Sequence, residues 1–222
     1  MIRLLRICFF LFVIRPLVFF VMGIHIRGKE RIPLHGPAVL VANHNSHLDT
    51  MVLMSLFPLS MLKHIFPVAA ADYFLKSKIG SWFFLNIIGI LPIERNRNPV
   101  ESNEDPLKSA SEKLEAGNIL ILYPEGSRGE PEKMIPFKKG IAHLAKKHPT
   151  VPIIPFFIVG LGKSLPKGEA LFVPFVCDIY VGNPIYGQEE PDKFMEDLKK
   201  EFEQLKRYHP NLGFLEEEQA WF

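Results

Sequence analysis

Residues 38–49 read Ala38-Val39-Leu40-Val41-Ala42-Asn43-His44-Asn45-Ser46-His47-Leu48-Asp49. The first five are consecutive apolar residues, a pattern typical of a strand that is buried on both faces of a sheet. Polar residues follow directly at the end of this strand. In open α/β sheets ligands bind beyond the carboxyl ends of the strands. The segment therefore predicts both an α/β fold and the place where chemistry occurs.

His44 and Asp49 are the two residues of this segment best suited to move a proton. They are five positions apart, about 140° around a regular helix, so they cannot share one helical face. They can meet if His44 lies in the loop and Asp49 in the first helical turn. A carboxylate bound to one ring nitrogen would fix the tautomer and leave the other nitrogen as a general base.

Two other interpretations of the segment remain open. Ser46-x-x-Asp49 also resembles the start of a helix, with Ser46 as the cap and Asp49 reaching back to the backbone. In that case His44 is an ordinary loop residue. A metal site built from His44, His47 and Asp49 is the other alternative, although the sequence offers no convincing distant fourth ligand.

Strand and helix patterns alternate along the rest of the chain. Apolar runs predict further strands near 90–93, 119–123 and 151–159, and one or two within 171–181. Helical patterns occupy 49–56, 77–88, 106–115, 140–147 and 192–208. The alternation predicts an α/β fold: a single layered catalytic domain, residues 28–210, with a largely parallel mixed sheet flanked by helices. The tail, 211–222, is expected to be poorly ordered or docked on the surface.

The N-terminus carries two apolar runs, 7–14 and 17–22, separated by Arg15 and Pro16. Each run is too short to cross a bilayer, which needs roughly 20 apolar residues. Joined, the runs would place an arginine near the middle of the membrane, beside a proline bend. This combination disfavours a simple transmembrane helix.

We therefore predict that residues 1–27 form a membrane-associated helical anchor, a broken or re-entrant pair of helices in one leaflet. Three arginines are expected to reach phosphate headgroups: Arg3, Arg6 and Arg15. A core helix and a spanning segment are the alternatives. A signal peptide is a further one, but no small-residue cleavage site follows the apolar run.

The composition limits the class of protein. With 222 residues the chain fits one domain, and 48% hydrophobic with 23% charged residues excludes a disordered chain and a polytopic membrane protein. The net charge of +2 gives no reason to expect nucleic acid as a partner. Cys8 and Cys177 lie in apolar runs without metal-ligand spacing, which predicts buried thiols in a reducing compartment.

Two further motifs follow predicted strands. One is Gly89-Ile90-Leu91-Pro92-Ile93-Glu94-Arg95, in which the final arginine is placed to bind an anion. The other is Tyr123-Pro124-Glu125-Gly126-Ser127-Arg128, followed by Phe137-Lys138-Lys139-Gly140. Its glycine lets the backbone approach a ligand, Arg128 could hold a phosphate, and Glu125 could orient an arginine or accept a hydroxyl. A surface arginine and a plain turn are the alternatives. Ser127 lacks the Gly-x-Ser-x-Gly context of a nucleophile.

A fourth motif, Val151-Pro152-Ile153-Ile154-Pro155-Phe156, is a core strand by its pattern alone. Together and in this order, the four motifs resemble those of the glycerolipid acyltransferase family, whose best-known members are the 1-acyl-glycerol-3-phosphate acyltransferases. The resemblance runs from about residue 28 to about residue 185. Its specific parts are Asn43-His44-x₄-Asp49 and residues 124–128.

The resemblance implies that His44 and Asp49 are the catalytic dyad. His44 would take a proton from the acceptor hydroxyl, which then attacks the thioester of acyl-CoA or acyl carrier protein. No acyl-enzyme, cofactor or metal is expected. The acceptor would be a lysophospholipid at the membrane surface, on the cytoplasmic face of the inner (plasma) membrane. Its phosphate would be bound by Arg95, Glu125, Gly126, Ser127 and Arg128.

The chain departs from the family pattern in two places. Pro92 stands where the second motif usually has phenylalanine, and residues 69–74 lack a lysine that many members carry near the start of this stretch. Both places are where substrate could be read, so they leave the identity of the acceptor open. Another lyso-lipid acceptor, a hydrolase, and a non-catalytic lipid-binding protein of the same fold are the alternatives.

Overall fold

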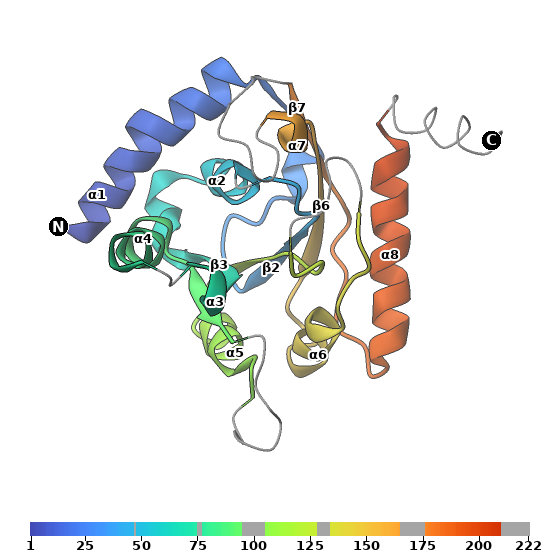
Figure 1. Cartoon of the computed structure of the whole chain (residues 1–222). Helices are drawn as coiled ribbons and strands as arrows, with labels where there is room; N and C mark the ends of the chain where they lie inside the picture. The colour runs from blue at the N-terminus through green and yellow to red at the C-terminus, as the bar shows by residue number, and fades with distance from the viewer. Residues whose placement is uncertain (47, 75–76, 95–104, 128–133, 165–175, 210–222) are drawn as a thin grey trace.

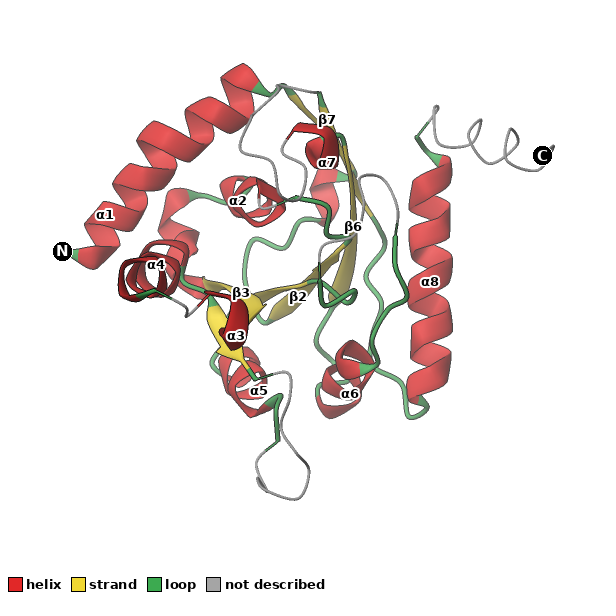
Figure 2. Ribbon diagram, viewed as in Figure 1, coloured by secondary structure: helices red, strands yellow, loops and turns green. Residues whose placement is uncertain are grey.

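The computed structural model describes residues 1–46, 48–74, 77–94, 105–127, 134–164 and 176–209. A seven-stranded sheet forms the centre, with helices on both faces (Figures 1 and 2). In spatial order the strands are β1 (Ile24–Arg27), β7 (Cys177–Val181), β6 (Ile153–Val159), β2 (Ala38–Ala42), β5 (Ile119–Leu122), β3 (Ile65–Ala70) and β4 (Leu91–Ile93). Neighbouring strands are parallel except β6 and β7. The expected α/β class with a largely parallel mixed sheet is confirmed.

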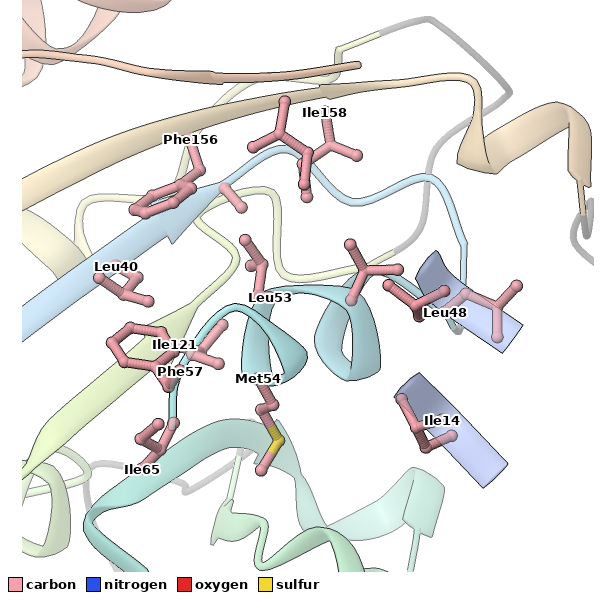
Figure 3. Packing of buried hydrophobic residues seen from close by; sticks show 14 of the residues in the cluster. Ile14, Leu40, Leu48, Leu53, Met54, Phe57, Ile65, Ile121, Phe156 and Ile158 are labelled. Carbon is pink, nitrogen blue, oxygen red and sulfur yellow. The ribbon is translucent and has the colours of Figure 1, made fainter. Parts of the chain in front are cut away.

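Strand β2 explains why helices cover both faces. All five of its residues are buried. Leu40 belongs to the apolar cluster beneath α2 (Leu48–Ser55) and the N-terminal helix, whereas Val39 and Val41 belong to the cluster on the other face. Figure 3 shows the first of these clusters, which includes Phe57. A strand buried on both sides has no polar face, hence its continuous apolar run.

Among the remaining helical segments are those that cover the second face of the sheet, opposite α2 and the N-terminal helix. They are η3 (Lys29–Arg31), η4 (Leu59–His64), α3 (Ala71–Phe74), α4 (Lys78–Phe83), η5 (Phe84–Ile88), α5 (Lys108–Glu115), α6 (Gly140–Lys147), α7 (Leu161–Ser164) and α8 (Pro191–Arg207). Helices α5, α6 and α8 bury their apolar faces in the second cluster. The predicted helices therefore exist, with ends within about two residues of those expected.

Two strands were not predicted, and each has a weak pattern. β1 has only four residues, alternately half-buried and exposed, and it pairs with β7 at the edge of the sheet. β3 contains Pro67 and two alanines, residues that are depleted in strands, although it pairs on both sides. Sheet pairing overrides these local preferences. The tail 211–222 lies outside the described residues.

The N-terminal segment is one continuous helix, so the predicted break at Arg15 and Pro16 is wrong. α1 (Ile2–Phe9) continues as η1 (Phe10–Ile14) and, past the proline, as η2 (Leu17–Val21). The last two are π-helical, and Arg15 and Pro16 keep right-handed helical dihedrals. The wider π-turns accommodate a proline that cannot donate a hydrogen bond. Within the described ranges, Ile2–Val21 is the one helix long and apolar enough to cross a membrane, by length and composition alone.

This helix lies along the body of the protein (Figure 1) and buries one stripe of its surface. The buried residues are four apart: Phe10, Ile14, Val18 and Met22. Other apolar residues of the helix are exposed: Leu4, Leu5, Leu11, Phe12, Val13, Phe19, Phe20 and Val21. Exposed apolar side chains in this number are typical of a surface that contacts a membrane or a partner.

Two of the three N-terminal arginines do not face outward, which corrects the prediction. Arg6 Nη2 donates to the carbonyls of Ile65 (3.2 Å) and Ile88 (2.8 Å), and Arg15 Nη2 donates to the carbonyl of Phe57 (2.7 Å). These carbonyls lie at the ends of neighbouring elements and need donors, which the guanidinium groups supply. Arg3 is exposed.

The cysteines differ from each other. Cys177 is buried in β7, as predicted, whereas Cys8 is only half-buried on the N-terminal helix. The two cysteines do not form a disulfide bond.

Candidate active site

The loop after β2 brings His44 and Asp49 together. His44 Nδ1 lies 2.9 Å from Asp49 Oδ2, with the imidazole 18% exposed and the carboxylate 1% exposed. Asp49 is in the first turn of α2 and His44 precedes the helix, the arrangement that five-residue spacing requires. An ionised Asp49 accepting from Nδ1–H leaves Nε2 as the basic nitrogen of the ring.

Asp49 also caps the loop, so its contact with His44 and its capping bonds occur together. Its Oδ2 atom accepts the backbone N–H groups of Asn45 and Ser46, each at 2.8 Å. Ser46 Oγ in turn accepts the N–H of Leu48 at 3.2 Å. The hydrogen bonds that begin the helix therefore also fix the carboxylate that faces the imidazole. His47 lies outside the described residues, and among the described ones no group of three metal-binding side chains occurs.

Asn43 fixes the loop to the sheet. Its Nδ2 donates to the carbonyl of Ile158 at 2.8 Å, and its Oδ1 accepts the N–H of the same residue at 2.7 Å. Ile158 belongs to β6, the neighbour of β2. This buried pair of hydrogen bonds takes the place of the backbone hydrogen bonds between β2 and β6 where β2 ends. It thereby sets the position of the next residue, His44.

Glu125 links the first motif to the third. Its Oε1 accepts the N–H of His44 at 3.0 Å and its Oε2 accepts the N–H of Ile135 at 3.4 Å. The side chain is 1% exposed. Burial raises the pKa of Glu125 to about 7, against the two backbone hydrogen bonds, which favour the charged form; nearby Asp49 adds a smaller upward shift. Through its two hydrogen bonds, the Glu125 carboxyl group joins the His44 loop to the segment that contains Ile135.

Tyr123, which comes directly after β5, covers one face of the imidazole. The rings of His44 and Tyr123 are stacked with centroids 4.0 Å apart, and the tyrosine hydroxyl lies 2.8 Å from Thr50 Oγ1. Burial raises the pKa of Tyr123 well above its ordinary value, with a smaller contribution from Asp49, so the phenol stays protonated. The sequence pattern predicts Tyr123 as part of a strand and gives Thr50 no role, because only the pairing of β2 with β5 brings the segments that carry them together.

A cavity of about 340 Å³ opens beside this group. Its wall includes His44, Thr50, Tyr123, Gly126, Ser127 and Lys138. Most of the remaining lining residues are apolar, among them Met51, Val68, Phe74, Phe84, Ile88, Ile90 and Leu122. The cavity wall therefore combines an imidazole, a lysine, a few other polar groups and a largely apolar surface.

The structure describes three of the five residues expected to bind phosphate. Gly126 and Ser127 line the cavity, whereas Glu125 is buried beneath the His44 loop. Arg95 and Arg128 lie outside the described residues. Lys138 lines the cavity as well, although sequence analysis noted it only as part of the segment after the third motif.

The family model described as Acyltransferase matches residues 23–159. The chain belongs to this family. The matched segment begins just before β1 and ends with β6, so it contains every cavity-lining residue named above. The N-terminal helix and α8 lie outside it.

Several plant and animal proteins are similar to this chain. It is 31% identical over 166 residues to 1-acyl-sn-glycerol-3-phosphate acyltransferase BAT2, chloroplastic, of Brassica napus, covering 74% of this chain and 45% of that protein. It is 32% identical over 168 residues to 1-acyl-sn-glycerol-3-phosphate acyltransferase LPAT1, chloroplastic, of Arabidopsis thaliana. That match covers 75% of this chain and 44% of the Arabidopsis protein. The alpha enzyme of Homo sapiens is 27% identical, covering 73% and 54%. The chain thus spans about half the length of these curated relatives.

A solved structure confirms the fold. The crystal structure of the 1-acyl-sn-glycerophosphate (LPA) acyltransferase PlsC from Thermotoga maritima matches with a TM-score of 0.72. The match covers 93% of the present chain and 79% of the Thermotoga maritima chain at 22% sequence identity. The structural match extends beyond residues 23–159, which the family model matches, so most of the chain shares this architecture.

Proposed function

We propose that the chain transfers a fatty acyl group from a thioester, acyl-CoA or acyl carrier protein, to the free hydroxyl of 1-acylglycerol 3-phosphate, which forms phosphatidic acid. The observation that carries the proposal is the His44–Asp49 pair, 2.9 Å apart, at the wall of an apolar cavity. The family and the names of the relatives support the reaction class and the acceptor.

His44 acts as the general base. Its Nε2 takes the proton of the acceptor hydroxyl while the hydroxyl oxygen attacks the carbonyl carbon of the thioester. Asp49 holds the Nδ1–H tautomer and stabilises the imidazolium that forms. The tetrahedral intermediate collapses with cleavage of the C–S bond, and the imidazolium returns the proton to the thiolate. The products are an ester and a free thiol.

The apolar wall holds acyl chain. A lyso-lipid or acyl thioester must bring its chain close to the dyad, and burying each CH₂ group contributes about 0.8 kcal/mol. Met51, Phe74 and Phe84 offer such a surface beside His44. The same wall excludes water, which would otherwise compete with the acceptor hydroxyl.

The protein acts at a membrane, and we place it on the cytoplasmic face of the inner membrane. The exposed apolar side chains of Ile2–Val21 support membrane association. The proposed acceptor is itself a membrane lipid, which agrees with this location. Acyl thioesters are made and used in the cytoplasm, so the site must open to that side.

The test is thioester consumption by purified protein in detergent, with and without lysophosphatidic acid. The variants are His44→Ala and, as a matched control, His143→Ala, an exposed histidine on α6. We expect acceptor-dependent turnover that His44→Ala lowers by about 10²–10⁴-fold and His143→Ala leaves intact. Thiol release that ignores the acceptor would indicate a hydrolase. Lipid binding without any turnover by folded protein would indicate a non-catalytic lipid-binding protein.

A further inference from the structure

We propose that Lys138 binds the phosphate group of the acceptor at the cavity wall beside the dyad. The inference rests on the proposed function and deepens it, because it assigns a phosphate partner within the described residues. It is carried by the position of Lys138 against Gly126, by its place in the cavity wall, and by its charge.

Lys138 is fixed to the turn that follows β5. Its backbone N–H donates to the carbonyl of Pro124 at 2.8 Å. Its side chain lies over Gly126, where an added Cβ atom would come within 2.9 Å of both Cε and Nζ of the lysine. Gly126 also has φ of +70°, a conformation that favours glycine. The glycine therefore leaves room for the lysine stem and keeps the ammonium group at the backbone of the turn.

The same turn connects Lys138 to the catalytic histidine. Tyr123, at its start, stacks on the imidazole of His44, and Glu125 accepts the backbone N–H of His44. Lys138 and His44 therefore both contact this short turn, and both line the cavity. A glycerol phosphate has its hydroxyl and phosphate only a few bonds apart, so it can contact both groups at once.

The charge distribution of the cavity favours an anion at Lys138. Among the described lining residues, Lys138 is the only lysine or arginine, and none is a carboxylate. No described carboxylate pairs with Lys138, whereas the adjacent Lys139 lies 2.6 Å from Asp192 on the surface. An ammonium group with no acidic partner among the described residues, in the same cavity wall as Ser127, suits the oxygens of a phosphate monoester.

The acyl donor carries phosphate groups too, in CoA or in the phosphopantetheine of the carrier protein. The phosphate of the acceptor is the one that must sit close to the dyad, because its hydroxyl reacts there. The experiment therefore varies the acceptor and the donor separately.

Binding and turnover are measured with the whole protein in detergent, for the parent, Lys138→Met, Lys138→Arg and the control Lys139→Met. For Lys138→Met we expect Kd and KM for lysophosphatidic acid to rise about 10–100-fold, the effect of losing a hydrogen bond to a charged group. With the phosphate-free acceptor 1-acylglycerol the same variant should match the parent. Lys138→Arg should recover most of the loss, and Lys139→Met should behave as the parent.

Three results would overturn the inference. One is an equal loss with both acceptors, which means general disruption; another is a rise only in KM for acyl-CoA, which assigns Lys138 to the donor. The third is a Lys138→Met variant that binds lysophosphatidic acid as the parent does. If the parent has no turnover but binds lysophosphatidic acid in a Lys138-dependent way, the proposed function fails and the phosphate site stands.

Discussion

The imidazole of His44 lies almost flat on the ring of Tyr123, with the ring planes inclined by 20° and the centroids 4.0 Å apart. The hydroxyl of Tyr123 is fixed by Thr50, from the first helical turn after the loop. The stack therefore holds the imidazole plane from one side while Asp49 holds one of its nitrogens. An aromatic face also stabilises the positive charge that the ring would acquire in the proposed reaction.

Tyr123→Leu is expected to lower kcat about tenfold with a small change in KM, because it removes the stacked face and keeps an apolar residue of moderate size. Tyr123→Phe keeps the stack and loses only the Thr50 hydrogen bond, so its kcat should stay within a few-fold of the parent. Steady-state kinetics measures both. Equal losses in the two variants would show that the hydroxyl, rather than the ring face, is what matters.

Asp49→Asn is expected to reduce kcat by about 10²–10⁴-fold, since an amide cannot stabilise an imidazolium at Nδ1. It should also cost about 1 kcal/mol of unfolding free energy, because the N–H groups of Asn45 and Ser46 lose a charged acceptor. Asp192→Asn, at an exposed surface pair with Lys139, is the control for both measurements. Full activity in Asp49→Asn would rule out the dyad.

The pH dependence of stability reports on Glu125. Its folded pKa of about 7 exceeds the ordinary value of 4.5, so the folded state binds more protons between these values and stability falls as pH rises through that window. Relative to Glu125→Gln, the parent should lose roughly 1–3 kcal/mol of unfolding free energy between pH 4.5 and 8. Chemical denaturation of both proteins across this range measures it. Parallel stability curves would contradict a raised pKa for Glu125.

Membrane binding tests the exposed side of the N-terminal helix. Phe12 and Phe20 are 69% and 87% exposed, so the double change Phe12→Ser/Phe20→Ser should leave the melting temperature unchanged. It should weaken partition into anionic vesicles at least tenfold, since a buried phenylalanine contributes about 1.5–3 kcal/mol. Vesicle sedimentation measures this, with exposed Tyr186→Ser as the control.

Unchanged sedimentation of the double variant would mean that another surface contacts the lipid. Deleting residues 1–24 is a poorer experiment, because it also removes Phe10, Ile14 and Val18 from the core. That deletion would mix the loss of membrane contact with the loss of packing.

Much of the fold followed from local pattern. Residues 38–42 and 119–122 are apolar throughout, and such runs are typical of strands covered on both faces. The amphipathic period of α8 likewise predicted the helix that covers the second face. β1 and β3 were not found, because a four-residue edge strand and a strand with proline depend on their neighbours for stability.

The N-terminal helix shows where local pattern was insufficient. Arg15 and Pro16 in an apolar run indicate a break only if the arginine has no partner inside the protein. The carbonyl of Phe57 supplies that partner, and flanking π-turns accommodate the proline. Neither can be read from residues 1–22, since Phe57 lies 42 positions from Arg15 along the chain.

The sequence by itself determined the α/β class and most of the strands, and it made a contact between His44 and Asp49 possible, because burial and helix geometry depend on residues close together in the chain. Tertiary structure alone decided which groups surround that pair. Tyr123 reaches His44 because β5 lies beside β2, and Lys138 lies over Gly126 because its backbone binds Pro124. Such contacts depend on strand order and on chain segments far apart in sequence, and no local pattern encodes them.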